Sequence, residues 1–178
     1  LSPMHRWIFL LAIALLWTPV SSAQITEEVS DITGEYRVSS QEMNDLWIDT
    51  YAGNYGAYMP RYVSDSTTDT ERWMIVLYGF TGEETSMSDV SNVYLNVDGR
   101  QIQPLEVSAR TRTIDNELME VVETTYTEAI FTRIANANEV RVDVNDEAFQ
   151  LRNREDMRMI VQTVNNQSRQ TASSGDSR

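Results

Sequence analysis

Residues 126–164 read YTEAIFTRIANANEVRVDVNDEAFQLRNREDMRMIVQTV, and this stretch decides the expected fold. After Thr127, whose side chain can cap a helix, apolar residues recur at helical spacing. From Val140 to Val144 valine alternates with polar residues, which predicts a strand with one buried face. Asn145-Asp146 suits a two-residue hairpin turn, because both residue types tolerate positive φ. This turn would pair Val142 with Phe149 on one face of the hairpin.

The same stretch ends in a second predicted helix. Asn153 can act as its N-cap, and two acidic residues follow in the first turn, where the helix dipole favours negative charge. Its apolar stripe, at i, i+3, i+4 and i+7, is Met157, Ile160, Val161 and Val164. We therefore expect helices at about 127–137 and 154–165 on either side of a β-hairpin.

The first 23 residues have the pattern of a signal peptide. Met4-His5-Arg6 is a short basic segment, residues 7–17 are an apolar run, and small residues at 21–23 offer a cleavage site before Gln24. The alternative is a helix that is not cleaved and anchors the chain. The run is shorter than the ~20 residues that span a bilayer, so we expect cleavage and a periplasmic or secreted protein.

The composition excludes several classes of protein. The chain has 27 acidic and 14 basic residues, and its formal net charge of −13 does not suit nucleic acid or an anionic membrane. It contains no cysteine, every basic residue is arginine, and the one histidine, His5, lies in the predicted signal peptide. Residues 24–178 therefore lack the side chains of Ser-His-Asp and Cys-His triads, Schiff-base lysines, His/Cys zinc sites and phosphate-binding loops. The acidity fits a solvated surface adapted to high salt, the interpretation we favour, and ordinary solubility is the alternative.

The rest of the chain predicts strands. The segment 72–80, RWMIVLYGF, is apolar on both faces and predicts a central strand, and Asp98-Gly99 predicts a hairpin turn. Residues 105–113 and 118–126 predict another hairpin, in which Glu120 points to the core face opposite Thr111.

Together these segments predict one α+β domain at residues 24–164, with a mostly antiparallel, meandering sheet and two C-terminal helices. Residues 165–178 are almost entirely polar and are predicted to be disordered.

Residues 39–52 fit two interpretations. Ser39 and Glu42 have the spacing of a capping box, and later apolar residues fall at helical spacing, so we interpret the segment as a helix. Trp47 and Ile48 also favour a strand.

Four tyrosines form a candidate binding surface near two glycines and a proline. Such rings could provide a stacking platform for sugars or for a partner peptide. The alternative is that the rings cover a sheet edge. The candidate binding residues are Tyr51, Tyr55, Tyr58 and Tyr62.

A candidate Ca²⁺ site follows the tyrosines. Asp65, Asp69 and Glu71 lie in one polar segment with several hydroxyl groups, and Ca²⁺ prefers oxygen ligands of this kind. The segment lacks the spacing and the glycine of an EF-hand loop, so a solvated loop is the alternative. No other cofactor is expected.

Residues 72–164 resemble a type of small exported bacterial α+β domain of unknown function. The shared features are the apolar strand, the Leu-x-Val-Asp-Gly hairpin at 95–99, a strand with Glu123, a Thr-capped helix ending at 134–137, the Val-x-Val-x-Val strand and a last amphipathic helix. The resemblance implies a fold and no activity.

These observations predict a non-enzymatic exported domain that binds or scaffolds an envelope protein or a glycan. A rival hypothesis is a carboxylate-dependent enzyme acting on glycans, which would need two carboxylates across a cleft at ~5 or ~6.5–9.5 Å. A third hypothesis is Ca²⁺-dependent adhesion through the Asp65–Glu71 segment.

Overall fold

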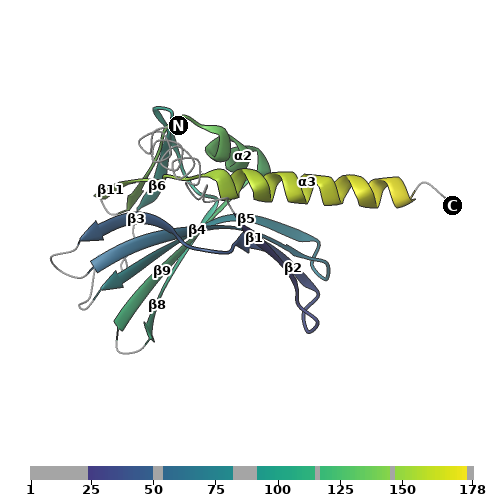
Figure 1. The fold of residues 1–178 in the computed structure, drawn as a ribbon, viewed down its shortest axis with the longest axis horizontal. Coiled ribbons are helices and arrows are strands. Elements are labelled where there is room, and N and C mark those ends of the chain that lie inside the picture. Colours follow the sequence, from purple (N-terminus) through teal and green to yellow (C-terminus); the bar gives the residue numbers. More distant parts are fainter. Residues whose placement is uncertain (1–23, 50–53, 82–91, 115–116, 145–146, 176–178) are drawn as a thin grey trace, which may run out of the picture.

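The computed structural model describes residues 24–49, 54–81, 92–114, 117–144 and 147–175. The predicted signal peptide, Tyr51, and the turns at 115–116 and 145–146 lie outside these ranges. The described part of the chain forms two antiparallel sheets and two helices (Figure 1). The expected α+β class, with mostly antiparallel strands and two helices, is confirmed.

The larger sheet has seven strands in the order β1-β2-β4-β5-β9-β8, with β3 also paired to β4. Strand β5 pairs with β4 from Tyr55 to Asp65, so β2 and β3 share the other edge of β4. The strands are β1 (Ile25–Val29), β2 (Glu35–Ser40), β3 (Asn44–Asp49), β4 (Asn54–Asp65), β5 (Thr70–Thr81), β8 (Glu106–Ile114) and β9 (Glu117–Tyr126). The predicted strand 72–80 is confirmed as the central part of β5.

The smaller sheet has four strands in the order β11-β10-β6-β7. They are β6 (Val93–Val97), β7 (Arg100–Ile102), β10 (Val140–Val144) and β11 (Glu147–Gln150). The sequence predicted one meandering sheet, and that prediction is wrong in this respect. The β6–β7 hairpin is not part of the larger sheet because β6 pairs with β10, a strand distant in sequence. The alternating valines of β10 face Val93, Leu95 and Val97 of β6.

Two predicted registers are confirmed. In the β8–β9 hairpin, Ala109 pairs with Val122, Thr111 with Glu120, and Thr113 with Leu118. In the β10–β11 hairpin, Val142 pairs with Phe149, and the N–H of Leu151 donates to the carbonyl of Val140 at 2.9 Å. Side-chain alternation fixed both registers, because a slip of one residue would turn every apolar side chain to the opposite face.

The helices are α2 (Glu128–Asn136) and α3 (Glu155–Gly175). The Thr127 side chain accepts a hydrogen bond from the N–H of Ile130 at 3.3 Å, which confirms the predicted cap of α2. Asn153 does not cap α3 as predicted. Its backbone has φ 52° and its side-chain amide donates to Oδ1 of Asn44 at 3.0 Å, which ties the start of α3 to β3.

The helical interpretation of residues 39–52 is wrong for the part that the structure describes. Ser39 and Ser40 end β2, and Asn44–Asp49 is strand β3. The capping-box spacing does not start a helix here because the edge of β4 offers a ladder of backbone partners to a segment that also has strand-forming residues.

The predicted disorder of residues 165–178 is wrong for most of the segment, because α3 continues to Gly175. The segment has few apolar residues, but most of its side chains tolerate a helix, and no proline or internal glycine interrupts it before Gly175. A helix already anchored by its apolar first half extends easily, since each further residue adds one hydrogen bond without a new nucleation step.

The described apolar core has two parts on opposite faces of the larger sheet. The main cluster packs that sheet against both helices and the smaller sheet, and it includes Trp73, Leu95, Phe131 and Met157. The second cluster consists of strand residues only, and its buried members are Val76, Tyr78, Met119 and Val121. We call the face that carries the second cluster the outer face of the larger sheet.

Candidate functional site

A groove of about 450 Å³ lies between the second half of α3 and strands β2 and β4. The strands present Tyr36, Tyr62 and Ser64, which share one face because Tyr36 pairs with Ser64 and Val38 pairs with Tyr62. The helix presents Val164, Gln167, Ser168 and Gln170, of which the first three stand at i, i+3 and i+4.

Aromatic rings connect this groove to the main core. The ring of Tyr62 lies 6.2 Å from that of Tyr36 and 4.7 Å from that of Trp73, between ring centroids. Trp73 in turn lies 5.4 Å from Phe131 of α2. Tyr62 is only 3% exposed, so it forms the floor of the groove, while Tyr36 is partly exposed at its side. The row of rings thus joins the strand wall of the groove to the main core.

The two tyrosine hydroxyls of the groove are neutral at physiological pH. Burial raises the pKa of Tyr62 to about 12. Burial, and then the Glu27 carboxylate that accepts a hydrogen bond from the Tyr36 hydroxyl at 2.8 Å, raise the pKa of Tyr36. All other lining residues are serine, glutamine or valine. The groove therefore offers hydroxyl and amide groups beside aromatic surface, with no formal charge in its lining.

A buried polar cluster fixes the helix that forms the other wall. Asp156, in the first turn of α3, is 5% exposed, and its Oδ2 accepts hydrogen bonds from the hydroxyl of Ser40 and, at 3.2 Å, from the amide of Asn44. A hydrogen bond to a buried carboxylate is stronger than one between neutral groups. These contacts hold the start of α3 on β2 and β3, and so set the direction in which the helix runs over β2.

The described structure does not bring the predicted tyrosines together on one exposed surface. Tyr58 is fully buried, and its hydroxyl donates to the backbone carbonyl of Arg152, so it braces the segment before α3. Tyr62 borders the groove, and neither of these two rings is an exposed platform. Tyr55 belongs to β4 but its side chain lies outside the described residues, as Tyr51 does altogether.

Sequence reasoning missed most of the groove. Tyr36 packs against the main core, but nothing in its strand indicated a binding residue. Gln167, Ser168 and Gln170 lie in the segment predicted to be disordered. The spacing of Gln167 and Ser168 after Val164 continues the buried stripe of α3, and that is the signal that could have identified these two residues.

The candidate Ca²⁺ residues lie in and beside the turn between β4 and β5. Oδ1 of Asp65 accepts hydrogen bonds from the backbone N–H of Thr67 at 2.8 Å and from its hydroxyl at 2.6 Å, and these bonds lower the pKa of Asp65. Asp69 takes a positive φ of 51°. Among the described residues, no three acidic, histidine or cysteine side chains gather as metal ligands, so Asp65, Asp69 and Glu71 do not form such a group.

The two carboxylates of a glycan-cleaving enzyme are not found in this groove, because none of its lining residues is acidic. Glu120, which the sequence placed on the core face opposite Thr111, does lie there and is 1% exposed. It belongs to β9, a strand that does not line the groove.

Comparison with models of known protein families gives no match, and comparison with curated proteins gives no significant match. The resemblance to small exported bacterial domains therefore stays a prediction from the residues quoted for it. Within the described ranges, no helix is both long enough and apolar enough to cross a membrane.

Proposed function

We propose that this chain is an exported, non-enzymatic binding domain, and that its groove between α3 and strands β2 and β4 holds a neutral, hydroxyl-rich ligand such as an envelope glycan. The observation that carries the proposal is the lining of the groove, which combines two neutral tyrosine hydroxyls with serine and glutamine side chains and no charged group. Ligand sites commonly combine aromatic surface with a few polar groups of this kind.

Amides and hydroxyls suit sugars because each can donate and accept hydrogen bonds with sugar hydroxyls. The partly exposed ring of Tyr36 adds an apolar surface for the C–H groups of a sugar ring. Export to the periplasm or beyond is supported by the basic, apolar and small-residue pattern of residues 1–23. A binding role without catalysis is supported by the absence of histidine, cysteine and lysine from residues 24–178.

The test is a screen of neutral oligosaccharides by calorimetry or on an array, with wild type and two matched variants of α3. Gln167→Ala removes an amide from the groove, and Gln162→Ala removes one from the exposed side of the same helix. We expect Gln167→Ala to weaken binding about tenfold, which corresponds to the loss of about one net hydrogen bond. Gln162→Ala is expected to bind as wild type does.

Two results would overturn this function. One is that no neutral oligosaccharide binds. The other is that the two glutamine variants have equal effects, which would place the ligand elsewhere on the molecule. The rival carboxylate-dependent enzyme and the Ca²⁺-dependent adhesion module gain no support from the groove lining or from the β4–β5 turn, and we do not propose them.

A further inference from the structure

The outer face of the larger sheet carries an arginine in an unusual setting. Side chains on this face alternate with those of the main core, so Met59 pairs with Val76, Arg61 with Met74, and Ala57 with Tyr78. Val76 is fully buried at the centre, while Met59 and Arg61 are partly exposed beside it. The face therefore presents a thioether and a guanidinium at the border of a small apolar cluster.

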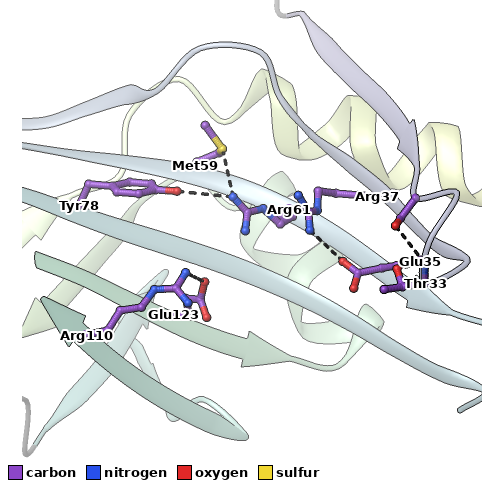
Figure 2. Close-up of polar contacts among 9 residues, drawn as sticks. Thr33, Glu35, Arg37, Met59, Arg61, Tyr78, Arg110 and Glu123 are labelled. Carbon is purple, nitrogen blue, oxygen red and sulfur yellow. Dashed lines mark hydrogen bonds and ion pairs between the residues drawn. The ribbon is translucent and has the colours of Figure 1, made fainter. Parts of the chain in front are cut away.

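Arg61 has only weak partners within the described structure. Its Nη2 lies 3.7 Å from the sulfur of Met59 and 3.5 Å from the hydroxyl of Tyr78 (Figure 2). Its Nε is buried and has no hydrogen-bond partner among the described residues. No described carboxylate lies within ion-pair distance of its guanidinium, whereas Arg37 and Arg110 on the same face each have an acidic partner.

Two carboxylates of the same face are engaged with other arginines. Glu35 pairs with Arg37 at 2.9 Å, and Glu123 pairs with Arg110 at 2.6 Å, as Figure 2 shows. In a chain with 27 acidic residues, a partly buried arginine without a described counter-charge is unexpected. Removing a cation from water is unfavourable unless an anion or strong acceptors compensate it.

We propose that this part of the outer face, where the partly exposed Met59 and Arg61 stand beside the buried Tyr78, docks an acidic segment of a partner protein. A carboxylate of that segment would accept two parallel hydrogen bonds from the Arg61 guanidinium, the geometry in which arginine binds carboxylates best. Apolar groups next to that carboxylate would pack on the Met59 side chain. We infer a negatively charged partner because the positive charge of Arg61 has no described counter-charge.

A protein segment fits this surface better than a small molecule does. The three residues lie on two neighbouring strands, and the partly exposed Met59 and Arg61 follow one of them, whereas small ligands need concave sites. Methionine, tyrosine and arginine are also enriched at the centres of protein interfaces. The surface lies on the opposite face of the sheet from the groove. A failure of the docking proposal would therefore leave the glycan-binding proposal untouched, and the reverse also holds.

The experiment selects a random peptide display library on the full domain, with counter-selection on Arg61→Gln. Peptides enriched on wild type are expected to contain aspartate or glutamate beside apolar residues. Their synthetic forms should bind Arg61→Gln at least about tenfold more weakly, because removing one partner of a hydrogen-bonded charge pair has effects of this size.

Arg112→Gln is the matched control. Arg112 is exposed on β8 of the same face, opposite Met119, and its removal changes the net charge equally. Three strand spacings separate β8 from β4, or about 14 Å. If Arg61→Gln does not fold, Arg61→Lys replaces it, because lysine keeps the charge but not the planar donor fork, and the same weakening is expected. The proposal is overturned if the selected peptides are not acidic, or if changes at Arg61 and Arg112 weaken binding equally.

Discussion

The hydroxyl of Ser40, the last residue of β2, donates a hydrogen bond to Oδ2 of Asp156 in the first turn of α3. Both residues are almost completely buried, and the amide of Asn44 donates to the same oxygen. Two segments distant in sequence are thus joined at one carboxylate. Because α3 forms one wall of the groove, this contact links the stability of the fold to the shape of the candidate site.

Replacing Ser40 with alanine should therefore destabilise the domain. The change leaves a buried carboxylate with one donor fewer, and we expect the free energy of unfolding to fall by about 1.5–3 kcal/mol. Urea denaturation measures this value. Ser39→Ala is the matched control, since Ser39 stands one residue earlier on the outer face, opposite Arg61, and should cost less than about 0.5 kcal/mol. Equal stability of the Ser40→Ala and Ser39→Ala variants would show that the Asp156 contact does not hold α3.

Phe131 connects α2 to the aromatic row that ends in the groove. It is fully buried, and its ring contacts that of Trp73. Phe131→Ala should lower the free energy of unfolding by about 3–5 kcal/mol, because it leaves a cavity in a packed core. The fluorescence of Trp73 should also change, as its neighbour is lost. Arg133→Ala, on the exposed side of the same helix, is expected to have little effect. A loss below about 1 kcal/mol at Phe131 would mean that the described packing of α2 is wrong.

Alkaline pH should destabilise the domain through its buried tyrosines. Tyr62 has a folded-state pKa of about 12 instead of the ordinary 10.0, because its ring is buried. Burial raises the pKa of Tyr58 and Tyr126 as well. Between the unfolded and folded values, the folded chain binds more protons, so the free energy of unfolding falls as pH rises above about 10, and the stabilisation is complete below it. Urea denaturation at about pH 9 and about pH 11 measures the loss, which Tyr62→Phe should reduce. An unchanged loss in Tyr62→Phe would contradict the raised pKa.

Local patterns in the sequence were sufficient to predict the registers of two hairpins. The pairing of Thr111 with Glu120 and of Val142 with Phe149 follows from alternation on either side of a short turn. In such hairpins, turn length and the burial of one face leave a single register. The cap of α2 at Thr127 was predictable for a similar reason, since the donor and the acceptor are three residues apart.

The remaining features depend on partners distant in sequence. Strand β3 forms because β4 offers a free edge, and the smaller sheet forms because β6 meets β10. The groove could not be predicted because its helix wall is polar and was taken for a disordered tail, and because Tyr36 and Tyr62 meet only once β2 pairs with β4. Arg61 could not be singled out from the sequence, because its lack of a described counter-charge is seen only once the positions of the surrounding carboxylates are known.

The second half of α3 should be necessary for the groove but not for folding. A chain ending at Asn165 keeps Met157 and Val164 in the core but lacks the three helix residues that line the groove beyond Val164. We expect it to fold, to lose no more than about 2 kcal/mol of stability and to lose glycan binding. Tyr36 should also react faster with a nitrating reagent, as measured by mass spectrometry of its peptide. A chain ending at Gly175 is the control and should behave as the full chain does. Intact binding in the shorter chain would show that α3 does not contribute to the ligand site, since that chain lacks all of the groove amides of α3.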